Sequence, residues 1–192
     1  MIYTCYSDGK DLSTYDRQKE VARSLINYGL LQEYGIIAEE IVKSPLGKPG
    51  FKKERNIKLS ISHCEGAVAV VISDHEVGID VERVRSYERE AARRILTEKE
   101  WSVLSKEKEN PDELFFRYWT LKESYIKALG TGLAYPLKNI SIAIENDRIQ
   151  SNKPWAKFYV VSNCEEYIIS VCHLHSKGQE DKEMSIRSFI IP

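Results

Sequence analysis

The sequence lacks any apolar run near the roughly 18 residues that a membrane-spanning helix needs, and its first residues lack the basic and apolar regions of a signal peptide. An excess of charge is missing too, because 28 Lys and Arg stand against 29 Asp and Glu among 192 residues, for a formal net charge of −1. This balance excludes a nucleic-acid binder that depends on bulk positive charge. We therefore expect a cytoplasmic protein that binds neither membranes nor nucleic acid.

Paired cysteines are also absent. The four cysteines (Cys5, Cys64, Cys164 and Cys172) are scattered without CxxC spacing, which predicts reduced thiols, most of them in buried strands. The segment Cys172-His173-Leu174-His175 alternates possible zinc ligands along a strand, but no second pair stands at a suitable spacing. We therefore predict no structural zinc site there.

The periodicity of the apolar residues predicts a mixture of helices and strands. Strict alternation at 57–63 and at 77–82 predicts half-buried strands, and the continuous apolar run 67–72 is typical of a strand covered on both faces. Later strands are expected at 140–144, 155–162, 166–174 and 186–191. Helices are expected at 13–33, at 85–96, after the capping-box residue Thr97, and at 112–129 before the Gly130 stop signal. No regular βαβ alternation is present, so the fold class is α+β.

Acidic residues two apart on one predicted strand are the first candidates for chemistry. Asp80 and Glu82 project from one face, and Gly78 leaves a spot without a side chain where a ligand could approach. Glu123 and Lys127 share a face of the 112–129 helix. From spacing alone, a solvated acidic face and a surface ion pair are the commoner explanations. However, the helix is apolar around much of its circumference, which favours a cleft where three carboxylates would suit Mg²⁺.

Two blocks of sequence carry a family resemblance. Gly78-Ile79-Asp80-Val81-Glu82 and the segment 119–133, WTLKESYIKALGTGL, resemble the signature pair of the 4′-phosphopantetheinyl transferases. Gly47-Lys48-Pro49 and Leu59-Ser60-Ile61-Ser62-His63 resemble two further blocks of that family, although Cys64 stands where Ser is common. The resemblance is to the longer, surfactin-synthetase-activator type. It implies the 4′-phosphopantetheinyl transferase fold: a monomer of two similar α+β lobes with pseudo-twofold symmetry, here residues 1–82 and 83–192.

The resemblance also implies an activity and its residues. Family members transfer the 4′-phosphopantetheine arm of coenzyme A to a serine of an apo acyl or peptidyl carrier protein and release 3′,5′-ADP. By the family pattern, Asp80, Glu82 and Glu123 would hold Mg²⁺, and Glu123 would take the serine proton directly or through a water. Lys127 would stabilise phosphate charge, and His63 would contact the pyrophosphate. Coenzyme A would also meet the Gly47-Lys48-Pro49 turn, with Lys48 near the 3′-phosphate, and Ser62.

Some assignments stay open at this point. The basic residue of the N-terminal half that would help to grip the 3′-phosphate has only candidates, namely Arg17, Lys19 and Arg23. Without the resemblance, His63 could equally be a structural histidine. Adjacent strand residues point to opposite faces, so Ser62 and His63 are not expected to form a nucleophile–base pair. Lys122 points about 100° away from Glu123 and is expected at the surface.

Residues 83–99 follow the acidic strand and are expected to contact the carrier. They contain Arg83, Arg85, Arg89, Arg93, Arg94 and Lys99, with an apolar strip formed by Ala91, Ala92, Ile95 and Leu96. A solvated helix with internal ion pairs is the alternative. For the whole chain, the alternatives are a non-catalytic binder of coenzyme A or carrier, and a Mg²⁺-dependent nucleotide hydrolase. Neither alternative accounts for all four blocks together, because the acidic triad is intact and a hydrolase has no need of the Gly-Lys-Pro and Ser-His blocks.

Overall fold

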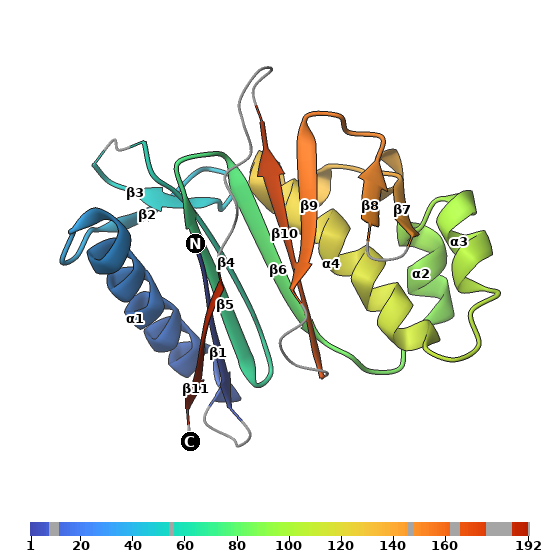
Figure 1. Ribbon diagram of the computed structural model, residues 1–192, viewed down its shortest axis with the longest axis horizontal. Coiled ribbons are helices and arrows are strands. Elements are labelled where there is room, and N and C mark those ends of the chain that lie inside the picture. The colour runs from blue at the N-terminus through green and yellow to red at the C-terminus, as the bar shows by residue number, and fades with distance from the viewer. Residues whose placement is uncertain (8–11, 54–55, 146–147, 162–165, 176–185, 192) are drawn as a thin grey trace.

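The computed structural model describes residues 1–7, 12–53, 56–145, 148–161, 166–175 and 186–191 (Figure 1). The longer elements are β1 (Ile2–Ser7), α1 (Tyr15–Tyr34), β4 (Lys58–Cys64), β5 (Ala67–Ser73), β6 (Val77–Arg83), α2 (Arg89–Ile95), α3 (Glu98–Leu104), α4 (Pro111–Leu129), β9 (Ala156–Val161), β10 (Tyr167–Leu174) and β11 (Ile186–Ile191). Two short hairpins complete them, β2 (Ile41–Lys43) with β3 (Pro49–Phe51), and β7 (Ile142–Glu145) with β8 (Arg148–Ser151). The predicted α+β class is confirmed. Among these residues no helix is both long and apolar enough to cross a membrane.

The first sheet has the strand order β11-β1-β5-β4, and α1 packs against one of its faces (Figure 1). Strand β5 is buried along its whole length, as its continuous apolar run predicts. Alternate residues explain why: Val68, Val70 and Ile72 belong to the core cluster under α1. Ala67, Ala69 and Val71 face the other way and join the core cluster that includes the second sheet.

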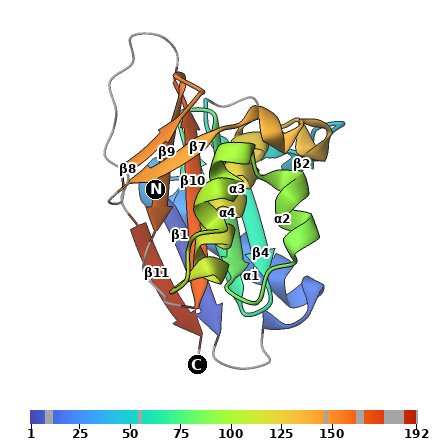
Figure 2. The ribbon, with the colours of Figure 1, turned by 90° about the vertical axis from the view of Figure 1, so that its right-hand side faces the viewer.

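The second sheet has the order β6-β10-β9, and α4 covers its other face. Val77, Ile79 and Val81 of β6 face the first sheet, as their alternation predicts. Seen from the side, α2 and α3 lie on the outer side of α4 (Figure 2). Strands β4 and β6 come together where the two sheets meet, since the Ile79 N–H donates to Ser60 Oγ at 3.1 Å.

The same succession of elements occurs twice along the chain. Strand, helix, hairpin and two strands follow one another as β1, α1, β2–β3, β4 and β5, and again as β6, α4, β7–β8, β9 and β10. In both sheets the first strand of the succession pairs with the last, antiparallel, and the last pairs with the fourth. Helices α2 and α3 are inserted in the second succession only.

Helix ends follow the predicted signals closely. The Thr97 side chain and the Glu100 carboxylate cap α3 reciprocally, and Gly130 ends α4 in the left-handed conformation with φ of 72°. Helix α2 is shorter than the predicted 85–96. The Val84 N–H donates to the Glu166 carbonyl at 2.8 Å, and the Tyr87 N–H donates to Asp112 Oδ1 of α4 at 3.0 Å. These tertiary bonds hold 84–88 as a connecting segment before α2.

Gly78 corrects one sequence-based expectation. A Cβ added at this position would collide with the α4 backbone at Ser124 and Ala128. The spot without a side chain therefore admits the helix rather than a ligand. Close approach of α4 to β6 is what requires glycine here.

Replacing Gly78 should consequently cost packing energy. We expect Gly78→Ala to lower the free energy of unfolding by about 1–3 kcal/mol, because the added methyl group pushes α4 away from β6. Gly50→Ala is the matched control, since no heavy atom lies within 4 Å of a Cβ there, and should change stability by less than about 0.5 kcal/mol. Urea unfolding of both variants measures the difference. Equal stabilities would contradict the packing argument.

Candidate functional site

The predicted site residues of β4, β6 and α4 meet in one pocket of about 430 Å³. It lies at the junction of the two sheets and is lined by Ser62, His63, Asp80, Glu82, Trp119, Glu123 and Lys127, together with Ile61 and Val81. Alternation on β6 turns Asp80 and Glu82 toward α4, and the i, i+4 spacing places Glu123 and Lys127 on the helix face that looks back at them. The expected convergence of these side chains is present.

A compact charged cluster occupies the floor of this pocket. The Lys127 ammonium donates to Asp80 Oδ1 at 2.7 Å and to Ser62 Oγ at 2.8 Å, and the Ser62 hydroxyl donates to Asp80 Oδ1 at 2.8 Å. Asp80 is 4% exposed. A buried carboxylate needs such compensation, which Lys127 supplies in the absence of other cations. Ser62 thus binds the acid from the neighbouring strand, a contact that the sequence alone did not predict.

Glu123 is the least compensated acid of the pocket. It is 9% exposed, and its Oε1 has no hydrogen-bond partner; Asp80 Oδ2 is likewise buried and unpartnered. Burial, reinforced by the nearby Asp80 charge, raises the pKa of Glu123 to about 7. Two buried oxygens without donors are costly unless a cation or a donor reaches them.

Glu82 lies at the rim and has partners on both sides. Trp119 Nε1 donates to Glu82 Oε1 at 3.3 Å, and Arg85 donates to Glu82 Oε2 at 3.0 Å. Trp119 opens the 119–133 block but was not among the predicted site residues, so its indole N–H is an addition to the site. Its place in the 119–133 block is the sequence signal that could have indicated it.

His63 and Ser62 point apart, as the strand geometry predicts. Ser62 is buried against Asp80, whereas His63 is exposed and contacts the Tyr15 ring at a centroid distance of 5.4 Å. Partial burial, together with the Lys127 charge, lowers the pKa of His63. The Lys19 ammonium lies over the same Tyr15 ring at 4.8 Å, and Arg17 pairs with Glu20. Lys19 and His63 therefore contact the same aromatic ring.

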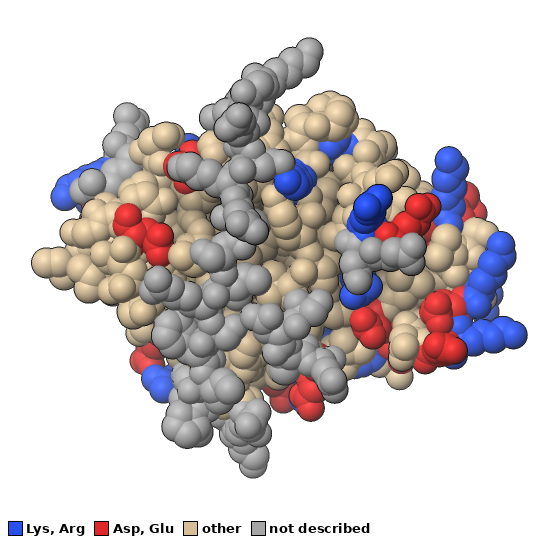
Figure 3. All heavy atoms as spheres, viewed as in Figure 1, with Lys and Arg blue, Asp and Glu red and all other residues tan. Residues whose placement is uncertain are grey.

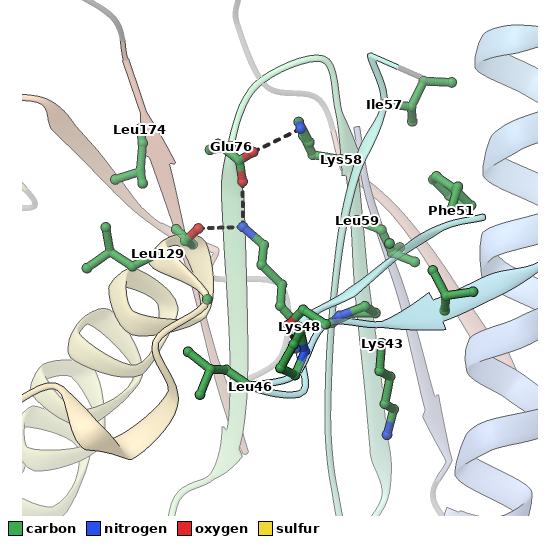
Figure 4. A pocket seen from close by; sticks show the side chains of 17 residues that line it. Lys43, Leu46, Lys48, Phe51, Ile57, Lys58, Leu59, Glu76, Leu129 and Leu174 are labelled. Atoms are coloured by element: carbon green, nitrogen blue, oxygen red, sulfur yellow. Dashed lines mark hydrogen bonds and ion pairs between the residues drawn. The ribbon is translucent and has the colours of Figure 1, made fainter. Parts of the chain in front are cut away.

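Lys48 and Pro49 of the Gly47-Lys48-Pro49 turn line a second pocket, of about 1090 Å³, beside the end of α4 (Figure 4). Gly47 has φ of 88°, so glycine suits the turn. The Lys48 ammonium donates to Glu76 and to the Ala128 carbonyl, and Lys58 binds the other Glu76 oxygen at 3.0 Å (Figure 4). Burial opposes ionisation of Glu76, but these two lysines outweigh it and lower its pKa. Lys48 is thus already engaged by an internal anion.

No group of three or more His, Cys, Asp and Glu side chains in the described ranges is arranged to hold a metal ion. The donor chemistry of the small pocket nevertheless suits a hard cation, because Asp80 Oδ2 and Glu123 Oε1 are carboxylate oxygens that lack partners. Lys127 compensates only the other oxygen of Asp80. The chemistry of these two donor oxygens is therefore of the kind that Mg²⁺ prefers.

Lys122 is not at the surface, contrary to the expectation from its angular position. Its side chain is fully buried and forms an ion pair with Glu100 at 2.6 Å. Burial lowers the pKa of Lys122 in spite of Glu100. The sequence interpretation was wrong because α4 is buried on several sides, so that pointing away from Glu123 does not mean pointing into water.

The predicted apolar strip in 83–99 also needs correction. Ala92 and Leu96 are 0% and 1% exposed and belong to the core under α4. The exposed groups of α2 are instead charged and include Arg89 and Arg93, whose guanidinium groups lie over the Trp101 ring at 5.3 and 4.3 Å from its centre. Basic and acidic side chains mix over this end of the molecule (Figure 3).

Two histidines of the Cys172–His175 segment pack with His75 in a group of three rings. Cys5, Cys64 and Cys172 are free thiols, and Cys164 lies outside the described residues. His173 is 7% exposed, and its ring centre lies 6.3 Å from that of His75 and 6.1 Å from that of His175. Burial, aided by His175, the terminal amine and His75 against Asp74, lowers the pKa of His173 to about 4.

This shift predicts a dependence of stability on pH. A histidine whose pKa is lowered on folding binds fewer protons when folded, so stability falls as the pH drops through its ordinary value of 6.5 toward 4. We expect this group to account for a loss of at most about 3 kcal/mol. In His173→Phe, the free energy of unfolding between pH 7 and pH 4.5 should fall less steeply than in the unmodified chain. Identical slopes in urea titrations would exclude the assignment.

Comparisons with known proteins identify the family of this chain. Residues 76–172, which include β6, α4 and most of β10, match the family model of the 4′-phosphopantetheinyl transferase superfamily. The 4′-phosphopantetheinyl transferase gsp of Aneurinibacillus migulanus is 33% identical over 174 residues, covering 84% of this chain and 73% of the relative. The 4′-phosphopantetheinyl transferase Sfp of Bacillus subtilis is 29% identical over 180 residues, covering 90% and 74%. The crystal structure of a Thermotoga maritima holo-[acyl-carrier-protein] synthase aligns with a TM-score of 0.46 at 24% identity, over 53% of this chain and 64% of that one. The pocket formed by β4, β6 and α4 is therefore that of a member of the 4′-phosphopantetheinyl transferase superfamily, to which this chain belongs.

Proposed function

We propose that this chain is a Mg²⁺-dependent enzyme that transfers the 4′-phosphopantetheine arm of coenzyme A to a serine of an apo acyl or peptidyl carrier protein. The serine oxygen forms a bond to the phosphorus that carries the pantetheine arm. The bond from that phosphorus to the bridging oxygen breaks, and 3′,5′-ADP leaves. The observation that carries the proposal is the pair of unpartnered carboxylate oxygens, Asp80 Oδ2 and Glu123 Oε1, beside Lys127 within the part of the chain that matches the family model.

Asp80, Glu82 and Glu123 would hold the cation. When bound, Mg²⁺ would neutralise charge on the pyrophosphate and polarise the attacked phosphorus. Glu123 would accept the serine proton directly or through a water, because its carboxylate lines the pocket beside Asp80 and Lys127. Lys127 would stabilise the negative charge that develops on the leaving 3′,5′-ADP, because its ammonium already lies in the pocket.

Coenzyme A would extend from this pocket along residues that already lie near one another. His63 would meet the pyrophosphate with Ser62 close by, while Lys48 in the Gly47-Lys48-Pro49 turn would bind the 3′-phosphate or the adenine side. Lys48 would have to exchange Glu76 for the ligand anion. Lys19 is the favoured additional contact for the 3′-phosphate, because it reaches the Tyr15 ring that His63 also contacts.

The repeated succession of elements supports two lobes with pseudo-twofold symmetry. Strand β6 pairs with β10, so its acids belong to the second sheet, and we place the boundary in the β5–β6 turn (74–76) rather than after residue 82. Because both lobes lie in one chain, their junction supplies the site without a second copy. We expect a monomer; sedimentation that shows an obligate trimer would contradict it.

Transfer itself is the direct test. The chain is incubated with coenzyme A, Mg²⁺ and an apo carrier protein, and the carrier is weighed by mass spectrometry. A gain of one phosphopantetheine arm together with released 3′,5′-ADP is the expected result. Bound coenzyme A without a mass gain would favour a non-catalytic binder. Cleaved coenzyme A with an unmodified carrier would favour a hydrolase. A panel of carriers then identifies the pathway that is served.

The acidic ligands should be required for their charge. Asp80→Asn and Glu82→Gln keep the side-chain volume, and we expect each to lower kcat by about a hundredfold or more while the fold survives. Glu145→Gln, which alters an exposed acid of the β7–β8 hairpin, is the control and should leave kcat unchanged. Calorimetric titration with Mg²⁺ should show weaker binding in the first two variants only. Normal turnover in either variant would overturn its assignment as a ligand.

The carrier should bind next to α2. Arg89→Glu with Arg93→Glu reverses two exposed charges, and we expect the KM for the carrier to rise about tenfold while the KM for coenzyme A stays within about twofold. Lys52→Glu with Lys53→Glu changes the net charge equally at two exposed lysines directly after β3 and serves as the control. If coenzyme A binding weakened instead, the arginines would serve the nucleotide.

A further inference from the structure

Lys122 and Glu100 form a buried polar hub that the proposed reaction does not use. The Lys122 ammonium donates three hydrogen bonds: to Glu100 Oε2 at 2.6 Å, to the Ile95 carbonyl at 3.0 Å and to the Leu137 carbonyl at 3.3 Å. An ammonium has three N–H donors, so every one is used. Both side chains of the pair are 0% exposed.

The Glu100 carboxylate extends the hub to two more segments. Its Oε2 also accepts the Thr97 N–H at 2.7 Å, which closes the capping box of α3. Its Oε1 accepts the Ile142 N–H at 2.7 Å, at the start of β7. The pair therefore ties the end of α2, the start of α3, the turn 137–139 and β7 to the middle of α4. Backbone groups from four segments depend on two side chains.

Stability alone gives little reason for such an arrangement. Burying an ammonium and a carboxylate costs desolvation energy that their attraction offsets only in part, and an apolar pair of similar volume is often as stable. The ionic pair instead fixes geometry, because its five hydrogen bonds hold the joined segments in one orientation relative to α4. Such a fixed orientation of these segments needs a functional explanation.

The sequence neighbours of the hub supply that reason. Lys122 is adjacent to Glu123, the proposed base, on α4. Glu100 is adjacent to Trp101, on whose ring Arg89 and Arg93 stack. The Ile95 carbonyl, held directly by Lys122, ends α2. The ion pair thus lies one residue along the chain from Glu123 of the acidic pocket and one residue from Trp101, on which the arginines of α2 stack.

We propose that Lys122 and Glu100 are positioning residues that hold the α2–α3 face at a fixed place relative to Glu123, so that a docked carrier presents its serine to the base. This inference rests on the proposed function, since it presumes that the carrier binds next to α2. It assigns to the first lysine of the WTLKESYIK segment a role in carrier geometry rather than in phosphate chemistry.

The test separates positioning from stability. Lys122→Met and Glu100→Met each leave one buried charge unpaired, and we expect both to lower Tm clearly. The double variant Lys122→Met with Glu100→Met removes both charges and should regain the part of that Tm that the unpaired charge cost. Its carrier KM should nevertheless stay raised by about tenfold, with the KM for coenzyme A within about twofold, because the Ile95 and Leu137 carbonyls and the Ile142 N–H are still not held. Lys106→Met, at an exposed lysine after α3, is the matched control.

Each outcome decides the question. A carrier KM that recovers together with Tm in the double variant would show a purely structural pair and overturn the proposal. A raised KM for coenzyme A with a normal carrier KM would also overturn it. Combining the double variant with Arg89→Glu and Arg93→Glu should raise the carrier KM less than the product of the separate effects, since both act on one surface. Absence of transfer by the unmodified chain would instead refute the proposed function, which distinguishes the two failures.

Discussion

The backbone of α4 rests directly on Gly78 of β6, and the geometry of the site depends on this contact. Because no side chain separates helix from strand, Ser124 and Ala128 lie against the strand. Glu123 and Lys127, each one residue before them, are thereby brought beside Asp80. The acids of two elements more than forty residues apart in sequence thus share one pocket as a result of one missing methyl group. Any side chain at this position would separate them.

The negative charges of the pocket are only partly compensated. Three carboxylates meet one ammonium, and Ser62 supplies a further hydrogen bond to the most buried of them. Lys127 satisfies one oxygen of Asp80, and Trp119 and Arg85 satisfy Glu82. What is left is one buried carboxylate oxygen without a partner on Asp80 and another on Glu123. Such oxygens suit a divalent cation or a proton, and the proposed reaction would use both.

Much of this arrangement could be predicted from the sequence, and the parts that could not share a cause. Alternation along 77–82 and the 112–129 helix locate the acids and Lys127 correctly, because each depends on the period of one element. The errors at Gly78, at Lys122 and at the start of α2 concern contacts between elements. A glycine can make room for a ligand or for a helix, and a lysine can point to water or to a buried glutamate. Periodicity does not distinguish such cases, since the deciding atoms lie elsewhere in the chain. Lys48 illustrates the same limit, because its internal partner Glu76 comes from the β5–β6 turn.

The parallel pairing of β1 with β11 has a consequence for the order in which the molecule assembles. Ile2 is opposite Ile186 and Ser7 opposite Ile191, so β1 completes its pairing with a strand that is made much later in the chain. Closing so long a loop costs chain entropy that local contacts do not repay until β11 is available. Until then β1 exposes one row of backbone hydrogen-bonding groups, although β5 can cover the other. The nascent chain therefore carries an open sheet edge for most of its translation, and this edge is where chaperones or mispairing with another copy would act.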